Sequence, residues 1–269
     1  MSELYDFRPI CLVGCMYKAL SKLLAARLKK VLDSIVSKSQ SVFVPSRQLM
    51  DGVLVVNEVV DYAAKTKKGI FLFKVNFENA YNTVTWNNLR NMLKRTRFGD
   101  LWLNWMEAMV FTTWTSVLVN ESPTFDFEVE KGLRQGDLLS PFLFALVAYG
   151  LSGLVRKASE IGEFSRFKVE ESCIADILQY VDDTLLIGEG NWRHVWSLKA
   201  ILRGFEMASG LRVNFHKSRL IRINISIHMF MAASNFLSCR IEEKAFSFIG
   251  IPIGSNPRRI STGNRYCPS

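Results

Sequence analysis

The sequence has few of the residues that build zinc sites and disulfide frameworks. It contains only three histidines, and its five cysteines are scattered and never spaced as CxxC. An odd number of scattered cysteines argues against a disulfide framework and fits a reducing compartment. No basic-then-apolar leader opens the chain, so we expect an intracellular protein, nuclear or cytoplasmic, rather than a secreted one.

Long apolar runs are also missing. The longest one, residues 141–155, is interrupted by Gly150, Ser152 and Gly153 and is shorter than the ~20 residues that a transmembrane helix needs. The 269 residues are 49% hydrophobic and 22% charged, which is the balance of a globular protein and excludes disorder as the default. We therefore expect a sizeable core and no membrane partner.

The charge is unbalanced towards the positive side. Lysine and arginine number 34 against 25 acidic residues, which gives a net charge of +9. Such a balance favours an anionic partner, nucleic acid among others, although a merely basic soluble protein has the same composition.

Apolar periodicity predicts helices and strands in the first half of the chain. A helical pattern runs from Leu20 to Leu32 through Leu23, Leu24, Leu28 and Val31. Lysines occupy its other side and predict a basic outer face: Lys18, Lys22, Lys29 and Lys30. A second helical pattern spans residues 52–64, and residues 71–75 form an apolar run that predicts a buried strand.

The second half continues the mixture. Residues 115–120 and 124–130 predict two strands joined by an Asn-Glu-Ser-Pro turn. Ser140-Pro141 begins a helix that is apolar almost all round, which predicts a central core helix. A further helix spans residues 192–209 and ends at Gly210. Since no repeat or linker divides the chain, one α+β domain is the simplest fold class.

Two adjacent carboxylates stand at the tip of a predicted hairpin. Apolar runs at residues 173–178 and 184–187 flank the segment that ends in Asp182 and Asp183. Neighbouring carboxylates repel one another unless something positive offsets them, and Mg²⁺ is commonly held by one or two carboxylates plus substrate phosphates. A solvated Asp-Asp turn is the alternative at this point.

Two other segments carry polar groups next to apolar elements. Residues 131–141 form a glycine-punctuated loop in which Arg134 and Gln135 offer donors to a base or phosphate. An ordinary loop with a helix cap is the alternative. Residues 73–82 end the predicted strand and turn outward.

Taken in order, these segments resemble a reverse transcriptase of the non-LTR (LINE-type) retrotransposon family, in the form plentiful in plants. The resemblance covers nearly the whole chain. It is carried by residues 6–10 (DFRPI), 43–48 (FVPSRQ), 73–82 (FKVNFENAYN), 131–141 (KGLRQGDLLSP), 180–183 (YVDD), 210–218 (GLRVNFHKS) and 248–254 (FIGIPIG).

The resemblance implies a right-hand polymerase with fingers and palm, in which an antiparallel palm sheet packs on helices. Residues 1–68 would form part of the fingers, and residues 69–254 the palm with the remaining fingers segments. Residues 255–269 show no periodicity and are expected to be an irregular tail. Because the chain starts almost inside the first fingers motif, we expect a fragment in which the thumb is absent or vestigial.

The family's chemistry implies an RNA template, a DNA primer and deoxynucleoside triphosphates as partners. Two Mg²⁺ ions, with Mn²⁺ as an alternative, sit between the palm carboxylates and the triphosphate in the family. Asp182 and Asp183 match two of the metal-binding acids, and the backbone carbonyl of Phe77 matches a further ligand. The oligomeric state does not follow from the sequence.

The sequence departs from the family at two positions. Asn76 stands where the remaining catalytic carboxylate is expected, and Asn82 replaces another aspartate. An amide oxygen contributes no charge to offset a divalent cation, and Glu78 is a poor substitute because the chain turns there. We expect weakened metal binding and impaired polymerisation. A non-catalytic nucleic-acid-binding remnant and an unselected pseudogene product are the alternatives.

Further roles follow from matching positions. The nucleotide-binding positions are Tyr81 as an aromatic gate against a ribose 2′-hydroxyl, Gln135 packing on the incoming nucleotide, Arg8 pairing with the triphosphate, and Lys217 as a donor to pyrophosphate. Arg47 and Arg134 match residues that contact the template backbone. The alternatives are structural, a core tyrosine and surface arginines.

Overall fold

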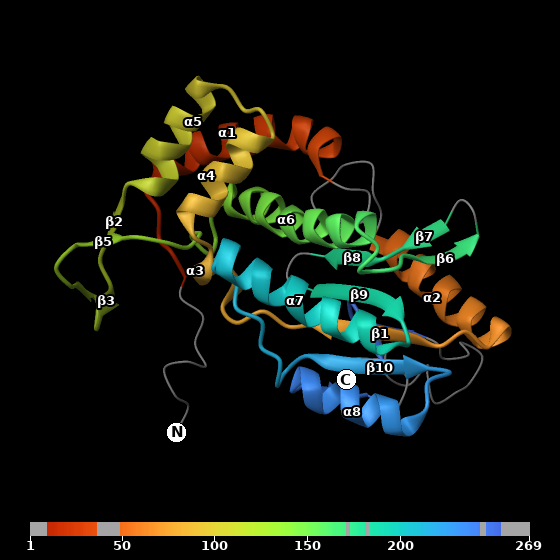
Figure 1. The fold of residues 1–269 in the computed structure, drawn as a ribbon. Coiled ribbons are helices and arrows are strands. Elements are labelled where there is room, and N and C mark those ends of the chain that lie inside the picture. Colours follow the sequence, from red (N-terminus) through yellow and green to blue (C-terminus); the bar gives the residue numbers. More distant parts are fainter. Residues whose placement is uncertain (1–9, 37–48, 171–172, 181–182, 243–245, 254–269) are drawn as a thin grey trace.

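The computed structural model describes residues 10–36, 49–170, 173–180, 183–242 and 246–253 (Figure 1). Its helices are α1 (Cys15–Ile35), α2 (Leu49–Thr66), α3 (Ala80–Thr83), α4 (Trp86–Arg95), α5 (Asp100–Met106), the π-helical turn η2 (Glu107–Phe111), α6 (Ser140–Glu160), α7 (Trp192–Ser209) and α8 (Ile227–Leu237). Its strands are β1 (Ile70–Val75), β2 (Thr113–Thr115), β3 (Leu118–Val119), β4 (Ser122–Pro123), β5 (Phe127–Val129), β6 (Phe167–Glu170), β7 (Cys173–Ala175), β8 (Ile177–Tyr180), β9 (Asp183–Glu189), β10 (Arg219–Ile223), β11 (Arg240–Ile241), β12 (Ser247–Phe248) and β13 (Ile251–Pro252). The chain is thus a mixture of helices and strands, as its α+β pattern predicts.

A five-stranded sheet in the order β11-β10-β1-β9-β8 organises the molecule. The central strand β1 is antiparallel to both of its neighbours, with Leu72 opposite Ile221 on β10 and opposite Ile187 on β9. β8 continues the antiparallel arrangement, whereas the two-residue strand β11 runs parallel to β10. The sheet therefore joins segments that are more than 100 residues apart in the sequence.

The side chains of β1 divide between two apolar cores, one on each face of the sheet. Phe71, Phe73 and Val75 pack into a core built with α1, α4, α6, α7 and α8. Ile70 and Leu72 pack into a second core with α2, β6 and the β12–β13 hairpin. Successive residues of a strand point to opposite faces, so this two-sided burial explains why five of the six residues of β1 are apolar.

The helix α6 is the central helix of the larger core, as its all-round apolar sequence predicts. Among the described residues it is the one helix long and apolar enough to span a bilayer by length and composition, and half of its most apolar window is buried inside the protein. Its buried residues include Leu143, Phe144 and Leu146. Leu139 holds the N-cap position, one residue before the predicted Ser140, and Pro141 lies in the first turn.

The hairpin and the helix predicted from the second half are both present. Tyr180 pairs with Asp183, so β8 and β9 form a tight hairpin whose tip, residues 181–182, lies outside the described residues. The apolar run before it is divided, because Asp176 separates β7 from β8. The helix α7 ends where the sequence predicts, at Gly210, which has a φ of 79° and whose missing side chain leaves room for the carbonyl oxygen of Thr83.

The prediction for the first helix is correct in position and half wrong in burial. Leu24, Leu28 and Leu32 are buried, and the four lysines are exposed as expected. However, the side chains of Leu20 and Leu23 are exposed, as is Val31. Residues three and four apart share a helix face, so α1 has two apolar stripes, of which only one reaches the core.

The segment after η2 is more irregular than the predicted pair of strands. β2 pairs with β5 and β3 pairs with β4, so two short ladders replace one continuous hairpin. The turn lies at Asn120 and Glu121, both with positive φ, and Ser122-Pro123 belongs to a strand. Positive φ at both central residues is the geometry of tight hairpin turns, which explains the position. We call residues 113–130 the arm (Figure 1).

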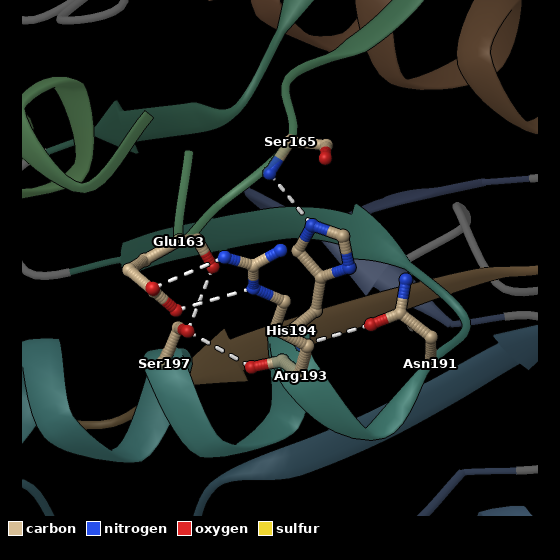
Figure 2. A network of polar contacts seen from close by, with 6 residues as sticks. All are labelled: Glu163, Ser165, Asn191, Arg193, His194 and Ser197. Carbon is tan, nitrogen blue, oxygen red and sulfur yellow. Dashed lines mark hydrogen bonds and ion pairs between the residues drawn. The ribbon is translucent and has the colours of Figure 1, made fainter. Parts of the chain in front are cut away.

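The start of α7 is held to the rest of the protein by a polar network around a buried histidine (Figure 2). The backbone N–H of Ser165 donates to Nε2 of His194 at 2.6 Å, and Asn191 caps the helix by accepting from the backbone N–H of His194 at 3.0 Å. Arg193 donates twice to the carboxylate of Glu163, at 3.1 and 3.2 Å. The ring of His194 lies edge-on to Phe164 at 5.2 Å between centroids.

Burial lowers the pKa of His194 below its usual value, and the nearby Arg193 adds to this against an opposing effect of Glu189. The imidazole therefore stays neutral in the folded protein at pH values where the unfolded chain takes up a proton. In that pH range the unfolded state binds more protons than the folded state. The contribution of the neutral His194 to the free energy of unfolding is therefore fully present above about pH 6.5 and declines as the pH falls.

We predict that the free energy of unfolding of the wild-type chain falls more between pH 7 and pH 5 than that of His194→Gln. The amide of glutamine can accept from Ser165 but does not titrate. Urea unfolding at each pH measures the difference, and His216→Gln, at an exposed histidine, is the control that should retain the wild-type slope. Equal slopes for His194→Gln and the wild type would contradict the prediction.

Candidate active site

The candidate site lies where β1 ends and β9 begins. Val75 pairs with Thr184, so the next residue on each strand, Asn76 and Asp183, lies at the same end of the sheet. Strand alternation places Lys74 and Asp183 on the face that also carries α2 and the β12–β13 hairpin. The structure thus brings together Asn76 and Asp183, two of the positions predicted from the sequence, while Asp182 lies outside the described residues.

The backbone of Asn76 is fixed by the turn at residues 214–218. Its N–H donates to Oγ of Ser218 at 3.0 Å, and its carbonyl accepts from the N–H of Asn214 at 2.7 Å. Ser218 is fully buried and donates in turn to the carbonyl of Asn214 at 2.8 Å. The side chain of Asn76 itself is exposed at this end of the sheet. An aspartate would therefore fit at this position without a change of backbone.

Phe77 and Glu78 continue past the strand as a short bridge to Val213. Two backbone hydrogen bonds form this bridge. The N–H of Asn214 donates to the carbonyl of Asn76, and the N–H of Glu78 donates to the carbonyl of Arg212 at 2.9 Å. Neither of these two bonds uses the carbonyl oxygen of Phe77. The ring of Phe77 packs edge-on against the ring of Phe205, with 6.1 Å between the centroids. The predicted role of the Phe77 carbonyl as a metal ligand stays a prediction.

Lys74 is a site residue that the sequence reasoning missed. Its Nζ lies 3.4 Å from Oδ1 of Asp183 and donates to the carbonyl of Ser247 at 3.2 Å. The available signal was a single charged residue inside an otherwise apolar buried strand, since such a charge requires a partner. The ammonium already offsets the negative charge of Asp183.

The described donors fit a divalent cation only in part. Asp183, the amide of Asn76 and the carbonyl of Phe77 supply oxygen atoms, which are the ligands that Mg²⁺ prefers. Only one of the three is a carboxylate, and it is paired with Lys74. No group of three or more acidic, histidine or cysteine residues suited to a metal occurs in the part of the chain that the structure describes.

The structure brings Gln135 and Asn82 together. Nε2 of Gln135 donates to Oδ1 of Asn82 at 3.2 Å, so the second position expected to depart from the family pattern contacts a predicted nucleotide-binding residue. The neighbouring Tyr81 is half-buried, and its ring is stacked on Phe144 of α6 at 5.0 Å. The roles predicted for Tyr81 and Gln135 in nucleotide binding stay predictions.

The glycine-punctuated loop approaches the chain's own backbone. Gly132 has a φ of 94°, and a Cβ there would lie 2.9 Å from the carbonyl oxygen of Asn82. Its N–H donates to Val84 at 2.8 Å, and the next residue, Leu133, donates to Tyr81 at 2.7 Å. Only glycine combines this backbone conformation with so close an approach, so the glycine sets the distance between the loop and the Tyr81–Asn82 turn.

A buried carboxylate, which the sequence reasoning did not single out, anchors the same loop. Asp137 accepts from the hydroxyl of Tyr17 at 3.0 Å, from the hydroxyl of Ser21, and from the backbone N–H of Leu139 at 3.3 Å. Burial, together with the charge of Asp137, raises the pKa of Tyr17 to about 12, against an opposing effect of Arg134. Asp137 thus ties α1 to the first turn of α6.

Arg134 makes its contacts inside the protein. It donates to the carbonyl of Met109 at 3.1 Å and to Oγ1 of Thr113 at 2.9 Å, and its guanidinium lies 4.3 Å from the ring centre of Tyr17. Its predicted contact with the template stays a prediction. Lys217 is exposed in the turn beside Ser218. Arg8 and Arg47 lie outside the described residues.

A mostly antiparallel sheet with helices packed on it, and a carboxylate at the first residue of β9 beside the end of the central strand, agree with the α+β polymerase fold that the resemblance implies. The family model described as reverse transcriptase (RNA-dependent DNA polymerase) matches residues 3–253. The chain belongs to this family, and its relatives identify it as a reverse transcriptase domain of the non-LTR retrotransposon type.

Two curated relatives and a solved structure illustrate the similarity. The transposon TX1 uncharacterized 149 kDa protein of Xenopus laevis is 24% identical over 258 residues, which is 95% of this chain and 19% of that protein. The Pol polyprotein of the R2 retrotransposable element of Popillia japonica is 22% identical over 82% of this chain and 30% of its own length. Telomerase of Candida albicans, in complex with a fragment of telomeric RNA, shares the fold at a TM-score of 0.58 and 12% identity, over 87% of this chain and 37% of its own. The chain thus spans less than a third of the length of these two curated relatives.

We predict that Asp137→Ala lowers the free energy of unfolding by at least about 3 kcal/mol. The half-buried hydroxyl of Tyr17, the hydroxyl of Ser21 and the backbone N–H of Leu139 then lose their acceptor, at roughly 1–3 kcal/mol each, and the hydroxyl of Ser140 loses a longer contact of 3.5 Å. Urea denaturation measures the loss. Ser21→Ala is the matched control, because it removes one donor and leaves the carboxylate with its other partners, and it should cost about 1 kcal/mol. Similar losses in the two variants would show that the carboxylate is not the anchor.

Proposed function

We propose that this chain binds an RNA template paired with a DNA primer and, in its present sequence, transfers nucleotides poorly because its metal site lacks a carboxylate. Residues 1–68 act as part of the fingers, and residues 69–254 as the palm with the other fingers segments. Two Mg²⁺ ions and deoxynucleoside triphosphates are the family's cofactors and substrates, and Mn²⁺ is the alternative to Mg²⁺. The scattered cysteines favour a reducing compartment, so we place the protein inside the cell.

One observation carries the proposal. At the end of β1 an asparagine stands beside Asp183, and the charge of Asp183 is already offset by Lys74 at 3.4 Å. A divalent cation in such a site gains less from its ligands than it does between two or three free carboxylates. Binding of a nucleic acid depends on the excess of positive charge instead, and that excess is retained at +9.

Primer extension on an RNA template, with Mg²⁺ and separately with Mn²⁺, tests the proposal. We expect the unmodified chain to extend poorly and Asn76→Asp to raise incorporation by at least about tenfold, which corresponds to about 1.4 kcal/mol of transition-state stabilisation. Affinity for the template–primer duplex, measured in parallel by fluorescence anisotropy, should change little. Robust Mg²⁺-dependent synthesis by the unmodified chain would contradict the proposal.

Asn79→Asp is the matched control for this experiment. It makes the same chemical change three residues further on, at an exposed position with a φ of 45° that aspartate tolerates. We expect no gain of activity from it. A cooperative melting transition of the unmodified chain should accompany these measurements, because an unselected product that does not fold would give neither extension nor a transition.

A separate prediction concerns Lys74. In the Asn76→Asp background, Lys74→Gln should tighten binding of Mn²⁺ by a factor of about two to five, because a half-exposed ion pair is worth about 0.5–1 kcal/mol. Electron paramagnetic resonance of free Mn²⁺ measures the affinity without any turnover. Lys157→Gln, which removes an equal charge from an ion pair with Glu160 on α6, should leave the affinity unchanged. An unchanged affinity for Lys74→Gln would show that the ammonium does not compete for Asp183.

A further inference from the structure

The hydroxyl of Ser218 is a fully buried polar group with two defined partners. It accepts a hydrogen bond from the backbone N–H of Asn76 at 3.0 Å and donates to the carbonyl of Asn214 at 2.8 Å. The first of these bonds joins residues that are 142 positions apart in the sequence. A buried hydroxyl destabilises a protein unless it is hydrogen-bonded, so these two bonds explain how a serine is accommodated at this position. They also tie the end of β1 to the turn that precedes β10.

Position 76 lies just beyond the sheet. The ladder of β1 with β10 ends at Lys74, and its ladder with β9 ends at Val75. The backbone of Asn76 bonds instead to the turn before β10, because its N–H donates to Ser218 and its carbonyl accepts from the N–H of Asn214 at 2.7 Å. The hydroxyl of Ser218 thus takes the part that the carbonyl of a neighbouring strand plays within a ladder.

The turn that carries Ser218 is itself held in place. The carbonyl of Asn214 accepts from both the N–H and the hydroxyl of Ser218, each at 2.8 Å, and Oδ1 of Asn214 accepts from the N–H of Lys217 at 3.0 Å. The buried ring of Phe215 packs against the ring of Phe73 on β1, with 6.5 Å between the centroids. The hydroxyl therefore occupies a defined place relative to the strand that it holds.

We propose that Ser218 is a positioning residue, whose hydroxyl sets where the side chain at position 76 stands relative to Asp183. A hydrogen bond to the N–H of a residue restricts its φ, one of the two soft dihedrals of the backbone, and φ determines the direction of its Cα–Cβ bond relative to the preceding strand. Ser218 acts through residue 76 and makes no contact with a cation or a nucleotide itself. The inference rests on the proposed function, because this placement matters when residue 76 is a carboxylate that shares a cation with Asp183.

Binding of Mn²⁺ alone, measured by electron paramagnetic resonance of the free ion, tests this role without any turnover. In the Asn76→Asp background, Ser218→Ala should weaken Mn²⁺ binding about tenfold, since removing a group that orients a metal ligand costs about 10–100-fold. In the unmodified chain, where residue 76 carries no charge, the same substitution should change the affinity by less than about twofold. A general loss of stability would act in both backgrounds, so the dependence on the carboxylate at position 76 identifies positioning.

Ser209→Ala is the matched control. Ser209 is also fully buried, and its hydroxyl also accepts from a backbone N–H, that of Leu211 at 3.1 Å, and donates to a carbonyl, that of Phe205 at 2.6 Å. The two alanine variants should lower the melting temperature to a similar degree, whereas Ser209→Ala should leave the Mn²⁺ affinity unchanged in the Asn76→Asp background. If Ser218→Ala does not fold, Ser218→Cys takes its place, because a thiol is similar in shape and only a weak acceptor. It should weaken Mn²⁺ binding in the same background-dependent way.

Two results would overturn the role of Ser218 while the proposed function stands. One is an unchanged Mn²⁺ affinity on substitution of Ser218 in the Asn76→Asp background, and the other is an equal loss of affinity in both backgrounds. A different result would contradict the proposed function itself: Asn76→Asp alone would bind Mn²⁺ no more tightly than the unmodified chain. The positioning role would then fall with it.

Discussion

The alternation of side chains along β1 is the constraint on which the rest of the structure depends. Its odd-numbered residues enter the core formed with α6 and α7, and its even-numbered residues enter the core formed with α2. The same alternation continues to the end of the strand, where Lys74 lies on the face of Asp183. A shift of one residue would exchange the two faces and bury the lysine in the larger core. Burial and the geometry of the site are therefore determined by the same register.

Among the described residues, Asp183 and Lys74 form an ion pair at this end of the sheet. Asp183 is negative, Lys74 is positive, and Asn76 adds nothing to either. A carboxylate that is already paired with an ammonium attracts a cation less than a free carboxylate does. The backbone around Asn76, held by Ser218 and Asn214, is nevertheless intact. At position 76, the expected departure from the family pattern thus concerns the charge of the side chain, while the backbone that would position a carboxylate there is held in place.

Local sequence patterns predicted the positions of the helices and strands well. Which side chains are buried, and which partners they contact, depends on long-range contacts that these patterns do not show. The apolar run at 71–75, the hairpin before Thr184 and the helix ending at Gly210 were all predictable, because each depends on a short segment of sequence. The exposure of Leu20 and Leu23 was not, since periodicity shows which residues share a face and not which face meets the core. Lys74 and Asp183 are 109 residues apart, Tyr17 and Asp137 are 120 apart, and Thr113 and Arg134 are 21 apart, and no spacing rule in the sequence reaches that far.

The position of β1 in the sheet has a consequence for how the chain folds. β1 ends at Val75, while its partner β9 begins only at Asp183, so 108 residues (183 − 75) must be made before the first ladder can close. At about 5–20 residues per second of synthesis, an apolar strand waits for roughly 5–20 seconds without its neighbours. Such non-local pairing also makes refolding slow. The most buried strand of the native sheet is thus the segment of the nascent chain that most needs protection from other unfolded chains.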